Sequence, residues 1–463
     1  MKQKSVRIVV ISRGKATLFF YLCSRIIASS LFLLIFASKR VNMMKKIAFC
    51  LFLFLNTTMM LAQDLNEYLL DRLTASWQCR QVDYEDMTNV VLNNKDNLDS
   101  YLRGLAFVEI MRSEGNDSMT IKMIDKLFEL YNDSRIAGMR DYLLDTKKRL
   151  LLLDNRYDEI REMANYVGKR WSSDADMQQW VICHKRLADA AKDTKPVILK
   201  WGKNESRLAA NKNLTYQNDS LPFMTFNAKF NGVETDKLFM DTGLMTSMNI
   251  MRSFADKIGV RLLPDSLQMR SANRYGKVFN LQLGILDSLQ LGNVIIYNLP
   301  VYISDEEDQY GNIGVIGAPD LARFGYVELT ADSLILKKQF GYEEKEPNFT
   351  MNPGIKGTKC ICLPCICQGR TSKFILDTGS NSFLIPEGDN TAEIVAQVGE
   401  QNLEIAAGMY SHPLVEEHDA IGFWGIPILW ALDRICLDFK HTHVDFIRRK
   451  GVSNTLRLAS KNN

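Results

Sequence analysis

The sequence predicts a multidomain α plus β protein, in which an N-terminal all-α helical domain is followed by a bilobal all-β double barrel. Up to about residue 195 the chain is rich in Leu, Met, Lys, Asp and Glu, and its apolar residues recur at helical spacing. Beyond Pro196 the chain consists of short runs of β-branched and aromatic residues, separated by Asn-Gly, Gly-Asn and Pro-Gly steps. A repeat within this second part predicts two β lobes rather than one.

Composition and charge place the chain among globular proteins. It has 463 residues, of which 46% are hydrophobic and 24% charged, and this length leads us to expect two or three domains. The 57 basic and 54 acidic residues give a formal net charge of +3. This balance lacks the basic excess that is typical of nucleic-acid-binding proteins, so we expect no nucleic-acid partner.

A secretory signal peptide is predicted at residues 43–62. It opens on methionines and lysines, continues through the apolar run Ile47 to Leu55, and ends at Ala62, after which we expect cleavage. Residues 1–42 are then interpreted as a misassigned N-terminal extension, because Arg25 interrupts their apolar stretch near its middle. We therefore expect a secreted or periplasmic protein with no stable membrane span after signal cleavage.

Residues 63–200 are predicted to form the helical domain, with several antiparallel helices of ordinary length. Glycine is sparse there, and turn signals such as Asp154-Asn155 separate the apolar stripes. No convincing repeat near 34 residues is present, which leaves a tetratricopeptide-like stack only as an alternative. We interpret the stripes as the hydrophobic core of this domain. We interpret the domain as a candidate docking site for a protein partner, in preference to a propeptide that regulates access to a cleft in the β part. The clearest stripes are Leu98, Tyr101, Leu102 and Leu105; Ile124, Leu127, Leu130 and Tyr131; and Tyr157, Ile160, Met163 and Val167.

A β-hairpin is predicted immediately before the first Asp-Thr-Gly motif. Asn231-Gly232 lies between the runs 226–230 and 237–240, and this dipeptide favours the tight turn of a two-residue hairpin. The second strand of the hairpin then leads directly into Asp241.

The β part contains an internal duplication. Residues 231–243 and 368–379 follow the same plan, with a turn, a short polar link, Lys, three apolar residues and then Asp-Thr-Gly. Each copy ends in two bulky apolar residues and a glycine, at 315–317 and 423–425, followed by a closing pair of strands. The lobes are placed at 215–345, with Asp241, and at 350–450, with Asp377.

Asp241 and Asp377 are the candidate catalytic residues, because paired carboxylates can perform general acid-base chemistry. One group takes a proton from water while the other gives a proton to the substrate carbonyl. Two carboxylates held about 3 Å apart cannot both ionise cheaply, so they share one proton and titrate as a pair. A single Asp-Thr-Gly is a weak signal, whereas two copies in matching surroundings are a strong one.

The residues that follow each aspartate are predicted to support the pair. Gly243 and Gly379 would let the backbone of each loop approach the other closely. Thr242 and Thr378 would use their hydroxyls to hydrogen-bond across to the opposite loop and so hold the two carboxylates in a common plane.

Residues 215–450 resemble the aspartic peptidases of the pepsin and retropepsin type, with two retropepsin-like lobes fused in one chain. The resemblance rests on the two Asp-Thr-Gly motifs and their matching surroundings. It implies that each lobe is a small β-barrel, that the cleft between the lobes holds an extended peptide, and that a β-hairpin flap closes over it. It also implies that Asp241 and Asp377 are catalytic, and that a monomer contains both halves of the site.

The resemblance places the flap between Arg270 and Leu283, with Tyr275 and Gly276 as the candidate tip. A tyrosine at the tip would touch bound substrate, although a solvent-exposed turn tyrosine is an equal alternative. The second lobe offers only a shorter hairpin, at 399–410.

One residue departs from the family pattern, which commonly has Ser or Ala directly after the motif. Ser380 is regular and joins the dyad-supporting set, whereas Leu244 is not. A hydroxyl at this place normally hydrogen-bonds the nearby carboxylate, so Thr246 or a water would have to substitute beside Asp241. The departure supports an alternative, in which the chain is a catalytically silent peptide-binding module.

Four closely spaced cysteines, in the run 360–367, raise the question of a zinc site. We interpret them as buried strand residues, because the duplication aligns Cys365 and Cys367 with Ala228 and Phe230 on an inward-facing strand row. A disulfide stays an alternative. No histidine spacing of the zinc-peptidase kind and no phosphate-binding loop is present, so we predict neither metal nor cofactor.

Overall fold

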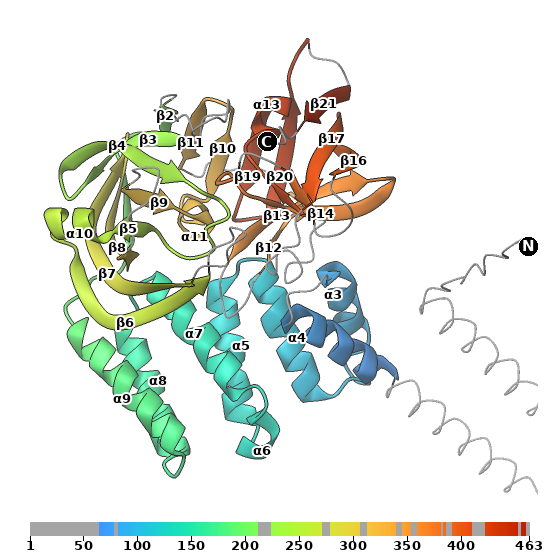
Figure 1. The fold of residues 1–463 in the computed structure, drawn as a ribbon. Coiled ribbons are helices and arrows are strands. Elements are labelled where there is room, and N and C mark those ends of the chain that lie inside the picture. The colour runs from blue at the N-terminus through green and yellow to red at the C-terminus, as the bar shows by residue number, and fades with distance from the viewer. Residues whose placement is uncertain are drawn as a thin grey trace, which may run out of the picture.

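The computed structural model of the chain describes residues 64–77, 82–211, 224–270, 278–305, 313–338, 345–352, 359–380, 383–385, 391–409, 422–451 and 455–459. The predicted extension (1–42) and signal peptide (43–62) lie outside these residues. Within them, a helical N-terminal region precedes a region that contains β-barrel structure, which confirms the predicted order of the α and β parts (Figure 1).

The helical region opens with a helical segment at 64–77 and continues through antiparallel helices. These are α3 (Tyr84–Asn93), α4 (Ser100–Ser113), α5 (Asp117–Leu130), α6 (Asp133–Ile136), α7 (Arg140–Leu153), α8 (Tyr157–Arg170) and α9 (Ala175–Ala190). Most begin after an Asp or Asn that caps the first turn, as Asp99 does by accepting hydrogen bonds from the N–H groups of Tyr101 and Leu102 at 3.0 Å. Asn155, with a φ of 57°, lies in the predicted turn between α7 and α8.

The predicted apolar stripes form the core of this region. Tyr101, Ile124 and Ile160 are buried together with most other members of the stripes. Leu130 is 61% exposed, and the prediction is wrong at this position because Leu130 is the last residue of α5, where the helix leaves the core.

A first sheet contains the strands that surround the first motif. In chain order they are β1 (Ile198–Trp201), β3 (Thr225–Phe230), β4 (Val233–Met240), β5 (Asn249–Met251), β6 (Arg261–Arg270), β7 (Val278–Leu291), β8 (Val294–Ser304) and β9 (Gly314–Ile316). Their order in the sheet is β1-β8-β5-β9-β4-β3-β7-β6. Two short helices, α10 (Arg252–Ile258) and α11 (Ala318–Ala322), follow β5 and β9.

A second sheet surrounds the second motif and repeats the central pairings of the first. Its strands are β12 (Thr350–Asn352), β13 (Cys360–Cys367), β14 (Arg370–Leu376), β15 (Phe383–Ile385), β16 (Thr391–Val398), β17 (Gln401–Met409), β18 (Phe423–Trp424) and β21 (Thr455–Ala459). The strand before each aspartate, β4 or β14, runs parallel to β9 or β18. The strand after it, β5 or β15, is antiparallel to the same partner. Both motifs therefore lie in the same local strand arrangement.

The hairpin that delivers each aspartate turns in the same way. Asn231 and Gly232 have φ values of 45° and 84°, and Gln368 and Gly369 have values of 48° and 75°. Two consecutive positive φ angles are typical of the turn whose twist matches that of antiparallel strands. The hairpin predicted at Asn231-Gly232 is thus confirmed, and Gln368 adopts the same conformation without being Asn or Gly.

A third sheet joins the two halves of the β region and was not predicted. Its order is β2 (Glu205–Ala209), β11 (Ser333–Lys337), β10 (Tyr326–Leu329), β19 (Leu432–Asp438) and β20 (His443–Arg448). The closing strand pairs expected in each lobe exist, but they meet here, with Tyr326 of β10 opposite Asp438 of β19. Both faces of β10 are buried, so this sheet is part of the common core. Strands also begin earlier than expected, since β1 and β2 precede residue 215.

The helical region packs against both halves of the β region (Figure 1). Leu263, Leu283 and Ile285, from the β6 and β7 strands, are each 1% exposed and belong to the hydrophobic core of the helices. On the other half, Lys359 forms an ion pair with Asp117 of α5 at 2.6 Å. The helices therefore form a layer that contacts the structure around each motif.

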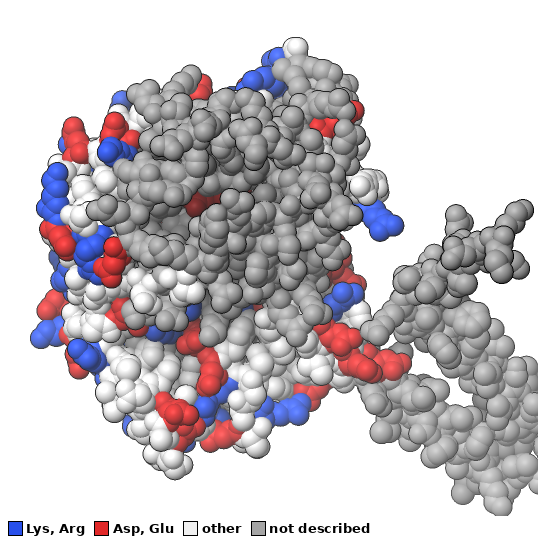
Figure 2. Space-filling model, viewed as in Figure 1, with Lys and Arg blue, Asp and Glu red and all other residues white. Residues whose placement is uncertain are grey.

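Figure 2 shows Lys and Arg side chains interspersed with Asp and Glu over the described part of one face. The described helices include none with the length and hydropathy that crossing a membrane requires.

Candidate active site

Asp241 and Asp377 directly follow the last residues of β4 and β14. The N–H of Asp241 donates to the carbonyl of Ile316 at 3.1 Å, and the N–H of Asp377 donates to the carbonyl of Trp424 at 2.9 Å. Ile316 and Trp424 lie in β9 and β18, the parallel neighbours of the two strands. The apolar segment at the end of each repeat thus fixes the backbone of one aspartate.

Thr242 and Thr378 hold the two loops together through four reciprocal hydrogen bonds. The N–H of Thr242 donates to Thr378 Oγ1 at 3.0 Å, and the N–H of Thr378 donates to Thr242 Oγ1 at 2.9 Å. The hydroxyl of Thr242 then donates to the carbonyl of Leu376 at 2.7 Å, and that of Thr378 to the carbonyl of Met240 at 3.0 Å. Both threonines are fully buried, so each hydroxyl satisfies one buried donor and one buried acceptor of the opposite loop.

Gly243 and Gly379 each lie against the carboxylate of the opposite loop. A Cβ atom added to Gly243 would lie 2.5 Å from Asp377 Oδ1, and one added to Gly379 would lie 2.5 Å from Asp241 Oδ1. The N–H of Gly243 donates to Asp241 Oδ1 at 2.8 Å, and that of Gly379 to Asp377 Oδ1 at 3.1 Å. The absence of a side chain at both glycines is what allows the two carboxyl groups to approach each other.

The electrostatics of the pair are unequal. Burial raises the pKa of Asp241 above its ordinary value, against the opposing effect of its hydrogen bonds, among them one with Asp377. Burial raises the pKa of Asp377 well above the ordinary value, and the negative charge of Asp241 and the hydrogen bond between the two side chains raise it further. One proton is therefore retained by the pair at a pH where an ordinary Asp is ionised. Such a pair can both accept and donate a proton.

The position after each motif differs between the two loops. Leu244 is 6% exposed and packs into the structure beneath its loop, where the second loop has Ser380. The hydroxyl of Thr246, considered above as a substitute, donates instead to the carbonyl of Ser247 at 3.2 Å. Thr246 therefore does not replace the missing hydroxyl beside Asp241.

The candidate flap tip, Tyr275 and Gly276, lies outside the described residues. The strands that flank it are described, and Arg270 of β6 pairs with Val278 of β7 in antiparallel register. A hairpin therefore leads toward the predicted tip. In the second sheet β16 and β17 form a hairpin whose turn includes Gly399.

The cysteine run lies in β13, with Cys360, Cys362 and Cys365 buried and Cys367 half-buried. Burial raises the pKa of Cys365 to about 12, so its thiol is protonated at neutral pH. The sulfur atoms of Cys360 and Cys362 lie 3.6 Å apart, well beyond the roughly 2.05 Å of a disulfide. Across the described residues, no three His, Cys, Asp or Glu side chains gather as metal ligands.

Sequence reasoning missed the contribution of the helical region to the surroundings of the site. The backbone N–H of Lys359 donates to the carbonyl of Met245, four residues after Asp241, at 3.0 Å. The side chain of Lys359 is paired with Asp117 of the helical region, 242 positions away in the sequence. No local pattern signals a contact over that separation.

Comparisons with known proteins relate part of the β region to a known family. Residues 226–319 match a family described as "Aspartyl protease", a segment that contains Asp241 but not Asp377. Among solved structures, the chain is similar to a retropepsin-like aspartic protease from Rickettsia conorii, with 19% identity, 30% of this chain and 90% of that chain covered, and a TM-score of 0.20. No curated protein matches the chain. The family match therefore supports an aspartyl protease segment around the first motif, and the expectation drawn from both motifs agrees with it.

Proposed function

We propose that the chain is a secreted or periplasmic aspartic endopeptidase, in which Asp241 and Asp377 activate water for peptide-bond hydrolysis. The observation that carries the proposal is the reciprocal bonding of Thr242 and Thr378, which holds two carboxyl groups against each other's glycine. Holding two buried carboxyl groups together costs stability, and such pairs with perturbed pKa values are typical of functional sites.

The proposed architecture is a duplicated, bilobal one in which each sheet and its aspartate form one lobe. The matching pairings around β4 and β14 support it, as do the matching turns before them. In this arrangement an extended peptide lies between the lobes, and the hairpin formed by β6 and β7 covers it.

In the proposed mechanism the pair begins with one proton, held by Asp377. Ionised Asp241 takes a proton from a water molecule as the water oxygen attacks the peptide carbonyl carbon. Asp377 gives its proton to the carbonyl oxygen, which yields a neutral tetrahedral intermediate. Asp241 then gives its proton to the amide nitrogen, and Asp377 takes a proton from a hydroxyl of the intermediate as the carbon–nitrogen bond breaks. The products are a carboxylic acid and an amine, and the pair returns to its starting state with one proton on Asp377.

The alternative is a catalytically silent module that binds peptides in the same cleft. Leu244 favours this alternative, because the buried leucine removes a hydroxyl from the surroundings of Asp241 and Thr246 does not restore it. The helical region would then serve to dock a protein partner.

The test is cleavage of a mixed peptide library by residues 63–463, measured from acid to neutral pH. We expect Asp241→Asn and Asp377→Asn each to lower the rate by at least about a thousandfold, since each removes half of the acid-base pair. Asp236→Asn, at an exposed position of β4, is the matched control and should leave cleavage unchanged. If the unsubstituted protein binds peptides without cleaving any of them, the binding-module hypothesis replaces the enzyme hypothesis.

The proposed location has its own test. Export of the full chain should yield a mature protein whose N-terminal residue is Gln63, as read by N-terminal sequencing. Retention of residues 1–62 on the exported protein would contradict the proposed signal peptide.

A further inference from the structure

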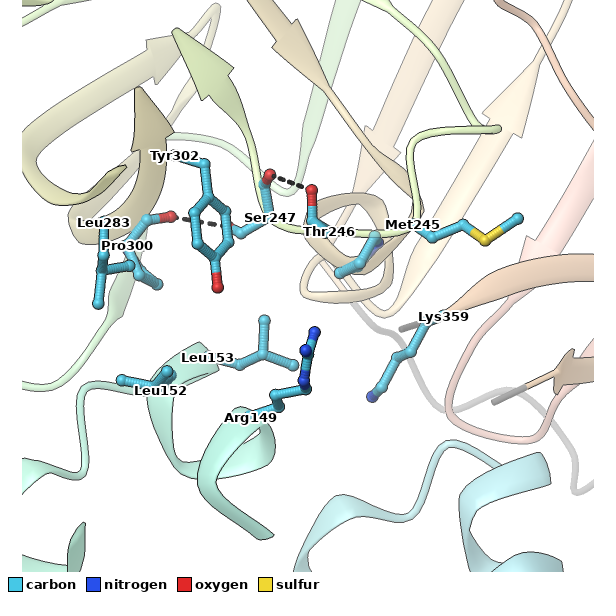
Figure 3. Close-up of a pocket in the computed structure, with 11 residues that line it drawn as sticks. Arg149, Leu152, Leu153, Met245, Thr246, Ser247, Leu283, Pro300, Tyr302 and Lys359 are labelled. Carbon is cyan, nitrogen blue, oxygen red and sulfur yellow. Dashed lines mark hydrogen bonds between the residues drawn. The ribbon is translucent and has the colours of Figure 1, made fainter. Parts of the chain in front are cut away.

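A small cavity lies where helix α7 meets the segment that follows Asp241 (Figure 3). Its volume is about 30 Å³, which is room for about two water molecules or for one carboxylate group. The helical region and the first sheet supply most of the wall, and Lys359 completes it from the start of β13. The lining residues are Arg149, Leu152, Leu153, Met245, Thr246, Ser247, Leu283, Pro300, Tyr302, Pro319 and Lys359.

The charged residues of the wall are both basic. Lys359 is paired with Asp117, with its Nζ atom 2.6 and 2.7 Å from the two carboxylate oxygens. Arg149 forms no hydrogen bond or ion pair with any residue that the structure describes, and Figure 3 shows its guanidinium between Leu153 and Lys359, directed toward the strand segment above. The cavity wall thus carries a guanidinium with no ion-pair partner among the described residues, and the cavity lining includes no Asp or Glu.

A second polar group without a partner faces the same space. The hydroxyl of Tyr302 points toward α7 in Figure 3, and it makes no hydrogen bond within the described part of the chain. Burial raises the pKa of Tyr302 to about 12, against the opposing effect of the positive charge of Arg149, so the hydroxyl keeps its proton and is a donor. Arg149 and Tyr302 are both half-buried, and two such donors without a described partner beside one cavity favour an acceptor that is supplied from outside.

The cavity wall is rigidly connected to the Asp241 loop. Ser247 Oγ lies 2.7 Å from the carbonyl oxygen of Pro300 and 2.8 Å from Asp320 Oδ1. A Cβ atom on Gly317 would lie 2.5 Å from the carbonyl oxygen of Leu244 and 2.8 Å from that of Thr246, so this segment is packed directly on the chain beneath it. A group bound in the cavity is therefore held at a set position relative to the first aspartate.

We propose that this cavity binds a carboxylate of the peptide substrate, with Arg149 as the specificity-determining residue and Tyr302 as a second donor. This inference rests on the proposed function, because it adds a side-chain preference to the same cleft. The planar guanidinium offers two parallel N–H donors, which match the two oxygens of a carboxylate. The favoured source of the carboxylate is the side chain of a Glu or Asp in the peptide, since an extended peptide presents its side chains to both walls of a cleft.

The experiment compares peptides that differ in one carboxylate. Starting from the library peptide that is cleaved or bound most strongly, Glu and Gln are placed in turn at each position, and each peptide is made with a free or an amidated C-terminus. Binding is measured by fluorescence anisotropy on Asp377→Asn, and kcat and KM are measured on the protein with both aspartates. Both measurements are repeated with Arg149→Gln, Arg149→Lys and, as a matched control, Arg186→Gln at an exposed position of α9.

At one position we expect the Glu peptide to bind at least about tenfold more tightly than its Gln counterpart, as loss of a charge-assisted hydrogen bond predicts. Arg149→Gln should reduce this ratio to about two or less, chiefly through KM and with little change for neutral peptides. Arg149→Lys should retain part of the preference for Glu over Gln, and Arg186→Gln should retain all of it. A preference that follows the free C-terminus instead of the side chain supports the cavity and identifies the terminal carboxylate as its source.

Equal binding of the Glu and Gln peptides at every position, together with equal binding of free and amidated C-termini, overturns the inference. A carboxylate preference that Arg149→Gln leaves intact also overturns it. The binding measurement decides this even for a protein that cleaves nothing, so failure of the proposed enzyme and failure of the cavity are distinguishable. Equal thermal midpoints for the Arg149 and Arg186 variants confirm that the comparison is made between folded proteins.

Discussion

The two Asp-Thr-Gly loops have nearly identical backbones and unequal chemistry. Each aspartate is bonded to the parallel neighbour of its strand, and each threonine makes the same two bonds to the opposite loop. The loops differ in the next residue, Leu244 in one and Ser380 in the other, and in how strongly the pKa of the aspartate is raised. The comparison shows that placement of the carboxyl groups comes from shared backbone geometry, whereas the residue that follows each motif is not shared.

The largest expected effect tests the shared geometry. Thr242→Val and Thr378→Val each keep the side-chain volume but remove a hydroxyl that serves two buried partners. Leaving a buried N–H and a buried carbonyl unpaired costs about 2–5 kcal/mol of unfolding free energy. We expect similar losses for the two variants in urea unfolding, together with at least a hundredfold loss of cleavage. A loss confined to one threonine would show that the loops are not equivalent in their backbones.

The next effect tests the unequal chemistry. The raised pKa of Asp377 means that the folded protein binds more protons than the unfolded chain above the unfolded pKa of about 3.9. Stability is therefore lost as the pH rises through that value toward the folded pKa. Asp377→Asn cannot ionise, so it should raise the Tm at pH 7 by at least about 2 °C and leave it unchanged near pH 3. Asp241→Asn should give a smaller rise, and equal rises would contradict the assignment of the proton to Asp377.

The smallest effect tests the position after each motif. The first loop has no hydroxyl there, so Ser380→Ala makes the second loop resemble the first in this respect. We expect a loss of cleavage of less than about tenfold, which corresponds to about one hydrogen bond, measured as kcat/KM at the pH optimum. A loss as large as that of the threonine variants would show that the Ser380 hydroxyl is part of the essential machinery, and would strengthen the silent-module alternative for a chain with Leu244.

Much of the fold was predictable because its signals are local. Asn231-Gly232 encodes its turn directly, and the apolar stripes of the helices are read from spacing alone. The approach of Asp241 to Asp377 was predictable for a different reason, since the same motif in matching surroundings occurs twice.

The remaining features depend on contacts between distant segments, which leave no local pattern. The pairing of β10 with β19 needs knowledge of how the two halves face each other. Arg149 belongs to a run of basic residues, which by itself predicts a solvated helix face. Only the packing of α7 against the first sheet brings Arg149 beside Tyr302. Leu263 and Leu283 read as ordinary strand residues, although they complete the core of the helices.

That shared core has a consequence for the order in which the chain folds during synthesis. The ribosome produces α3 to α9 first, yet their hydrophobic core is closed only when Leu263, Leu283 and Ile285 have followed. The pairing of Tyr326 with Asp438 comes later still and joins segments with a long loop between them, which is slow to close. A nascent chain thus exposes apolar helix surface until β6 and β7 have been made, a state that favours aggregation and makes chaperone binding valuable.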